Sequence, residues 1–143
     1  MGTDMQSTLD RINEIVATTN TTDFILHSFV GDSLLLIGSF DLCYYHELEI
    51  RFHDVSYIGL PVYGLDSPRL SVASEEERQA HAHLELGDDD VLFRLHDDPD
   101  FKGGRVYYVA AKRVSIVEGM VYHYVREDLK DGERIAEWVK ETG

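Results

Sequence analysis

Cysteine and long apolar runs are both scarce in this chain of 143 residues. The single cysteine, Cys43, cannot form an internal disulfide, which fits a reducing compartment. The longest uninterrupted apolar runs, residues 34–37 and 106–111, are far too short to cross a bilayer. Met1 to Thr8 is polar and lacks the basic start and apolar segment of a secretory signal. We therefore expect a cytoplasmic protein without a membrane segment.

Positive charge is also scarce, because 13 lysines and arginines stand against 27 acidic residues and give a formal charge of −14. Such a charge repels phosphate backbones and anionic membranes, so nucleic acids and membranes are disfavoured as partners. A protein partner, a small ligand or a second copy of the chain stays open. Residues 101–117 are the exception, with Lys102, Arg105, Lys112 and Arg113 and no acid, and we interpret them as a basic strand neutralised by neighbouring acidic loops.

The length and the apolar content of 43% indicate one globular domain over residues 1–143. The clearest local signal is the strict alternation of charged and apolar residues from Glu47 to His53. Only a β-strand places Leu48, Ile50 and Phe52 on one face and the charged residues on the other. This pattern predicts a half-buried antiparallel strand.

Similar patterns recur along the chain. A helix is expected from about Ser7, and strands are expected at 24–30, 33–40, 44–53, 55–60, 70–73, 91–96, 106–117 and 120–125. Gly31-Asp32 predicts a hairpin turn between the first two strands, and Gly119 predicts another before the last. The fold class is then α+β, with a largely antiparallel, curled sheet or partial barrel of about seven or eight strands and a helix at each end.

Residues 75–86 leave two alternatives. Ser74 and Glu77 have the spacing of a capping box, which predicts the start of a helix, and Gly87 could end that helix. The alternation of small or apolar residues from Ala80 to Leu86 instead predicts a strand. We favour a short helix followed by a strand.

On that strand, His81, His83 and Glu85 would point the same way, about 6.6 Å apart at successive α-carbons. Two imidazoles and a carboxylate at this spacing can share one divalent metal ion. The competing interpretation is a solvent-facing strand edge without a ligand. No other cofactor is expected.

Tyrosine is the most informative aromatic residue, because it combines a large contact area with one polar tip and suits a ligand cavity or a partner surface. The competing interpretation is ordinary strand packing. The candidate residues, all in expected strands, are Tyr44, Tyr45, Tyr107, Tyr108, Tyr122 and Tyr124.

The C-terminal helix is expected to be capped by Asp131 and to bury Ile135, Trp138 and Val139 on one face. Trp138 should be its main anchor, with a cost of roughly 3 to 5 kcal/mol for its replacement by alanine.

Other constellations are interpreted as structural. His46 and Cys43 would face opposite sides of an unbroken strand, which argues against a thiolate and its base. Glu47 and Glu49 share a face with Arg51 and are interpreted as an outer charged stripe. The sequence therefore favours a non-enzymatic binding or interaction module for a protein partner or small ligand; the alternative is a metal-dependent enzyme that uses His81, His83 and Glu85.

Overall fold

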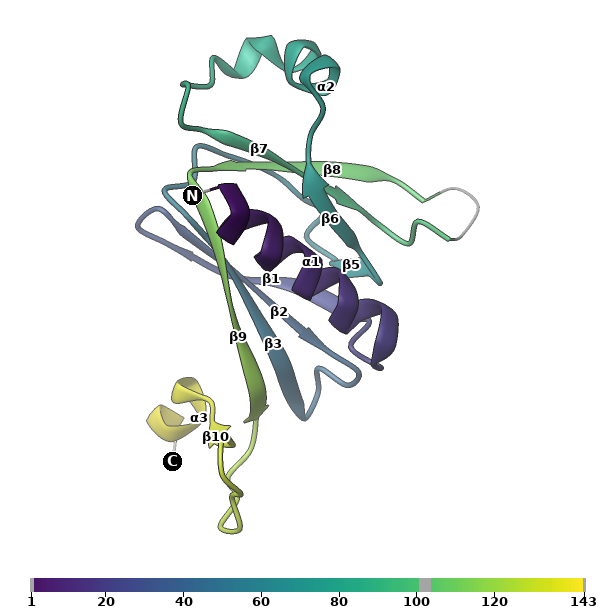
Figure 1. Ribbon diagram of the computed structural model, residues 1–143. Coiled ribbons are helices and arrows are strands. Elements are labelled where there is room, and N and C mark those ends of the chain that lie inside the picture. The colour runs from purple at the N-terminus through teal and green to yellow at the C-terminus, as the bar shows by residue number, and fades with distance from the viewer. Residues whose placement is uncertain (1, 101–103, 143) are drawn as a thin grey trace.

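The computed structural model describes residues 2–100 and 104–142. Within these residues three α-helices accompany ten strands, which form a six-stranded and a four-stranded sheet (Figure 1). All strand pairs are antiparallel except that of β10 with β9. None of the described helices is both long and apolar enough to cross a membrane. The predicted α+β class with largely antiparallel pairing is confirmed.

The first sheet has the order β10-β9-β3-β2-β1-β5, and the second has the order β4-β8-β7-β6. The strands of the first sheet are β1 (Asp23–Val30), β2 (Ser33–Ser39), β3 (Tyr45–His53), β5 (Leu65–Asp66), β9 (Arg113–Tyr122) and β10 (Arg134–Ile135). Those of the second are β4 (Tyr57–Gly59), β6 (Arg69–Val72), β7 (Val91–His96) and β8 (Val106–Ala111). The helices are α1 (Gly2–Thr18), α2 (Glu75–Ala80), the 3₁₀ helix η1 (Ala82–Leu84) and α3 (Glu137–Thr142).

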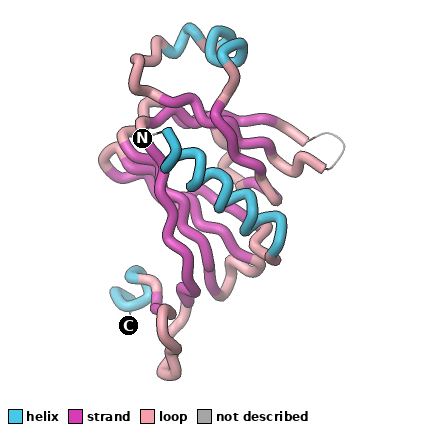
Figure 2. The backbone as a smooth tube through the Cα atoms, viewed as in Figure 1, coloured by secondary structure: helices cyan, strands magenta, loops and turns pink. Residues whose placement is uncertain are grey.

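Helix α1 covers one face of the first sheet and reaches the second, and it is the longest helix in the tube view (Figure 2). It starts at Gly2, five residues before the expected start. Its Leu9 and Ile12 are fully buried in a cluster that also contains Ile50 of β3 and Phe93 of β7. The two sheets and α1 therefore share one hydrophobic core.

The predicted hairpin at Gly31-Asp32 is present, with Gly31 in the left-handed region at φ +65° between the paired strands β1 and β2. Strand β3 alternates strictly between buried and half-buried residues, as its sequence predicts. Its buried side chains face the core, so its charged residues lie on the face opposite α1.

The expectation of one curled sheet or partial barrel is corrected, because the chain forms two sheets and neither is closed. The expected strand 106–117 is divided at Lys112 into β8 and β9, which belong to different sheets. The chain from β3 to β4 changes sheets at the same place. There the Lys112 amide donates to the His53 carbonyl at 3.0 Å, and the Ser56 amide donates to the Ala110 carbonyl at 2.9 Å. Strands that pass between sheets thus form a corner.

Residues 80–86 are not a strand, so this expectation is wrong. The capping box at Ser74 and Glu77 is present and starts α2, and the chain then continues through η1 to Glu85 in the left-handed conformation. The capping box and the bonds of Glu77 to the second sheet favour helix over strand here.

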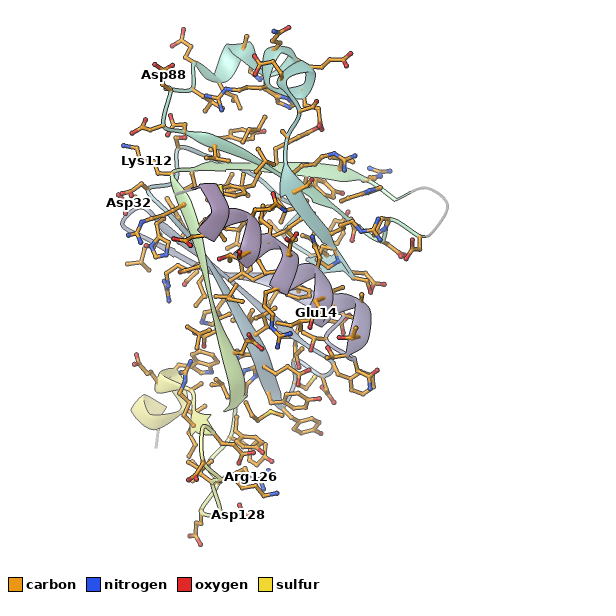
Figure 3. The ribbon with its side chains drawn as sticks, viewed as in Figure 1. Glu14, Asp32, Asp88, Lys112, Arg126 and Asp128 are labelled. Atoms are coloured by element: carbon orange, nitrogen blue, oxygen red, sulfur yellow. The ribbon has the colours of Figure 1, made fainter. Side chains whose placement is uncertain are left out.

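The expected C-terminal helix is also corrected. Ile135 lies in β10, which pairs in parallel with β9, and α3 begins only at Glu137. Asp131 lies in a turn before β10 and does not cap the helix. Trp138 is 38% exposed rather than substantially buried. Arg126 and Asp128, an ion pair at 3.1 Å, lie at the tip of the preceding segment (Figure 3).

Glu77 connects α2 to the second sheet. Its carboxylate accepts hydrogen bonds from the Ser74 amide, the Tyr108 hydroxyl and Arg94 Nε, at 3.0, 2.6 and 3.0 Å. The bonds from Ser74 and then Tyr108 lower the pKa of Glu77 from 4.5 to about 2.

We predict that Glu77→Gln destabilises the protein by about 1.5 to 3 kcal/mol near neutral pH, because it removes a charged acceptor. The folded pKa of Glu77 is depressed, so its stabilisation is present above about 4.5 and is lost as the pH falls toward 2. Urea unfolding should show a difference from wild type that shrinks in acid. The control is Glu76→Gln, an exposed residue in the same turn; an equal loss in both variants would contradict the role of Glu77.

Candidate functional site

A groove with a volume of about 510 Å³ lies between α3 and the face of the first sheet opposite α1. Its volume exceeds that of the open hollow of about 270 Å³ beside α2. Strands β1, β2 and β3 form the floor of the groove, and β10 and α3 form its wall. The charged and aromatic residues that line it are His27, Glu49, Arg51, Arg134, Glu137 and Trp138.

His46 lies beside this groove and is only 1% exposed. Its Nε2 lies 2.7 Å from Glu49 Oε2, and its Nδ1 lies 2.8 Å from His123 Nε2. The Nδ1–H of His123 in turn donates to the Leu42 carbonyl at 3.0 Å. Arg134 donates to Glu49 from β10. These residues form one continuous, partly buried chain of hydrogen bonds, with the fully buried His46 at its centre.

The contact of His46 with Glu49 depends on an irregularity in the sheet. Strict alternation would place the two side chains on opposite faces of β3. The register of β3 against β9 shifts between His46 and Leu48, and Gly119 of β9 has a φ of +142° in the facing stretch. Gly119 therefore lies within a bulged strand and not in the predicted hairpin turn, and β9 continues to Tyr122.

Trp138 of α3 packs against three histidine rings. Its centroid lies 4.5 Å from that of His27, 5.2 Å from that of His123 and 6.2 Å from that of His46, the last nearly parallel at 17°. The rest of the indole remains accessible from the groove. The histidines thus position α3 against the sheet.

The electrostatics of the cluster follow from these contacts. The hydrogen bond from His46, supported by the charge of Arg134, lowers the pKa of Glu49, so that Glu49 is a carboxylate. Burial lowers the pKa of His123, and burial together with the charge of His46 lowers the pKa of His27. His27 and His123 therefore favour their neutral forms.

Most polar groups of the cluster are already bonded to one another. Arg51 and Glu137 are different, because they line the groove yet their side chains have no hydrogen bond or ion pair with the described side chains of residues 4–100 and 104–139. A ligand in the groove would thus meet the accessible part of the Trp138 indole, the guanidinium of Arg51 and, on the α3 side, the carboxylate of Glu137. This combination suits a small planar molecule with a negative group.

The six candidate tyrosines do not form one surface. Tyr44, Tyr122 and Tyr124 meet at the far end of the first sheet, with ring centroids 5.6 to 6.4 Å apart, and Arg126 lies 4.3 Å above the Tyr122 ring. Tyr45 begins β3 and pairs with Tyr122 across the sheet.

Tyr107 and Tyr108 belong to β8 in the second sheet. Tyr108 donates to Glu77, and the Tyr107 hydroxyl lies 3.4 Å from that of Tyr63. The alternation of strands between two sheets therefore separates the tyrosines that the sequence placed together.

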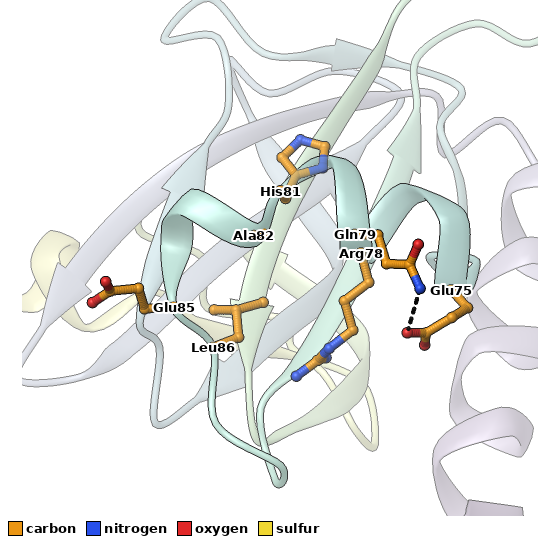
Figure 4. A pocket seen from close by; sticks show the side chains of 7 residues that line it. All are labelled: Glu75, Arg78, Gln79, His81, Ala82, Glu85 and Leu86. Atoms are coloured by element: carbon orange, nitrogen blue, oxygen red, sulfur yellow. Dashed lines mark hydrogen bonds between the residues drawn. The ribbon is translucent and has the colours of Figure 1, made fainter.

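The expected metal ligands lie on helical turns. The rings of His81 and His83 are 5.9 Å apart, and His81 Nδ1 lies 2.8 Å from the Glu77 carbonyl. His81 and Glu85 line an open hollow of about 270 Å³, but their side chains point in different directions (Figure 4). Among the described residues no group of three or more histidine, cysteine, aspartate or glutamate side chains is arranged to hold a metal ion. The strand on which the prediction depended is absent.

The basic stretch is neutralised only in part. Lys112 lies 3.3 Å from Asp89, as the acidic-loop interpretation requires, whereas Arg105 and Arg113 have no carboxylate partner within the described ranges. Lys102 lies outside the described residues.

Sequence reasoning missed the groove. It placed His46 on the core side, Glu49 in an outer charged stripe and Trp138 in a packing stripe. The seven histidines offered a signal, but His27, His46 and His123 are far apart in the chain and meet only through strand pairing.

Comparison of the chain with known protein families, with curated proteins and with solved structures gave no significant match. Function is therefore inferred from the geometry of the groove.

We predict that Trp138→Ala destabilises the protein by about 2 kcal/mol, less than for a fully buried tryptophan, because part of the indole already contacts water. The urea midpoint measures this difference. Leu129→Ala is a matched control, since Leu129 is 40% exposed in the preceding loop. Equal effects of the two substitutions would show that the histidine contacts of Trp138 contribute nothing.

Proposed function

We propose that this protein is a non-enzymatic cytoplasmic binding module and that the groove beneath α3 is its ligand site. The observation that carries the proposal is that Arg51, whose side chain has no partner among the described side chains, lines the same groove as the accessible indole of Trp138. The groove volume of about 510 Å³ lies within the range of small-molecule sites, which is roughly 300 to 1,000 Å³.

The state of the neighbouring polar groups favours binding over catalysis. A general acid or base must exchange protons with a substrate in the groove. Here both nitrogens of His46 and both nitrogens of His123 contact other protein groups, and Glu49 accepts from His46 and Arg134. The chain of bonds supports the wall of the groove.

The expected ligand is a small organic anion with a planar apolar part. The planar part would stack on Trp138, and the anionic group would accept hydrogen bonds from Arg51. The single cysteine of the chain supports a reducing cytoplasm as the place where this binding occurs.

We predict that benzoate binds in the groove, weakly because it is small, and that its neutral isostere benzamide binds less well. Binding should perturb the amide resonances of His27, Ser28 and Arg51 and the fluorescence of Trp138. Arg51→Gln should weaken benzoate binding about tenfold or more, because it removes a charged donor.

The matched control is Arg113→Gln. Arg113 also lacks a partner among the described residues, but it does not line the groove. We expect the affinity for benzoate to be unchanged in this variant. Equal losses in both variants, or no perturbation of the groove residues by benzoate, would refute the proposed ligand site.

The alternative of a metal-dependent site at His81, His83 and Glu85 stays a prediction. Zinc should then raise the melting temperature of protein purified without a histidine tag, and the rise should vanish in the His81→Ala/His83→Ala double variant. An unchanged melting temperature of the wild type would contradict the alternative.

A further inference from the structure

The chain of hydrogen bonds through His46 and His123 has two ends that only accept. At one end is the Leu42 carbonyl, and at the other is the Glu49 carboxylate, with His123 and His46 between them. A carbonyl and an ionised carboxylate carry no proton to donate. The three hydrogen bonds of this chain must therefore be made entirely with protons of the two imidazoles.

Two neutral imidazoles carry one proton each, which makes two in total. Three contacts join Leu42, His123, His46 and Glu49 in series, at 3.0, 2.8 and 2.7 Å. Each of these distances is that of a hydrogen bond, and each bond needs its own proton. The chain therefore requires one more proton than neutral histidines supply.

The number of protons that the chain needs depends on the orientation of the His46 ring, and its contacts fix that orientation. Both of its nitrogens face polar atoms, one of His123 and one of Glu49. Turning the ring over would put carbon atoms at these contacts and leave buried polar groups unpaired, which costs free energy. The ring order in the chain is therefore fixed.

The extra proton is best placed on His46. His123 favours its neutral form because burial lowers its pKa, and Glu49 favours its ionised form because His46 and Arg134 lower its pKa. A neutral His123 donates through Nδ1 to Leu42 and accepts at Nε2. His46 then donates through both nitrogens, as an imidazolium between His123 and the carboxylate.

We propose that the folded protein binds one extra proton in the His46–His123 pair and that this proton holds Trp138, and with it α3, against the sheet. The proposal concerns the proton and α3 alone; only its consequence for ligand binding depends on the proposed function. Loss of the proton would leave either the His46 Nε2–Glu49 contact or the His46–His123 contact without a donor. The packing of the Trp138 indole against the two imidazoles would then weaken.

Among the described residues, His27 faces this pair from β1 and Glu49 from β3, and Arg134 of β10 donates to Glu49. Arg51 of β3 and Glu137 of α3 line the adjoining groove. Glu49 stabilises the proton, whereas Arg134 and a protonated His27 oppose it. Because His27 favours its neutral form, its own protonation belongs to more acidic conditions.

The extra proton also sets the direction in which stability changes with pH. If the folded chain holds this proton at a pH where the unfolded chain does not, folding takes up a proton and stability falls as the pH rises. Trp138 should then become more exposed on the alkaline side of the ordinary histidine range, above about pH 6.5. Near neutral pH, α3 would be held against the sheet and the shape of the groove would be fixed. At alkaline pH, α3 could move and the shape of the groove could change.

The test uses the full chain without any ligand. Trp138 is the one tryptophan, so emission excited selectively at tryptophan rather than at the eight tyrosines reports on this site alone. We expect the emission maximum to move to longer wavelength as the pH rises from about 6.5 to 9. Nitrogen NMR of labelled histidines should show both nitrogens of His46 protonated at about pH 7.

Three variants separate the histidines. His46→Gln should abolish the alkaline change in emission, whereas His27→Gln and His83→Gln, the latter on distant η1, should retain it. If His46→Gln does not fold, the NMR measurement on wild type decides. A single protonated nitrogen on His46 at neutral pH, or emission that is constant over the alkaline range, overturns the proposal. Failure of benzoate to bind would refute the ligand site and leave this result intact.

Discussion

The antiparallel pairing of β3 with β9 is the interaction on which the rest of the structure depends. At one end this pairing forms the corner where both strands pass into the second sheet, with Lys112 bonded to His53. At the other end it places His123 beside His46 and directs the chain back so that β10 can pair with β9. The core and the groove are thus two consequences of one strand register.

The groove is supported by imidazoles whose nitrogens all have hydrogen-bond partners. Buried imidazoles are costly unless every nitrogen has a partner, and the chain from Leu42 to Arg134 supplies those partners. A chain that is satisfied internally makes a rigid wall. It also leaves Arg51 and the accessible face of Trp138 available to a ligand, in a protein whose overall charge is −14.

Predictions from sequence succeeded where the signal was local. The alternation from Glu47 to His53, the turn at Gly31 and the capping box at Ser74 each reflect contacts within a few residues. They failed where a distant partner decided the outcome. Ile135 has the spacing of a helical face, but pairing with Tyr122 of β9 draws it into a strand. Trp138 then belongs to a separate helix, which begins at Glu137, and stays partly exposed to water.

The sequence by itself determined the α+β class, the strand faces and the acidic surface, because side-chain period and composition are properties of short segments. Only the tertiary structure decided that there are two sheets, that the tyrosines separate, and that three histidines meet around Trp138. Strand register, the bulge near Gly119 and the return of the C-terminal segment depend on which strands pair. That choice is made by packing across the whole chain, and no local pattern encodes it.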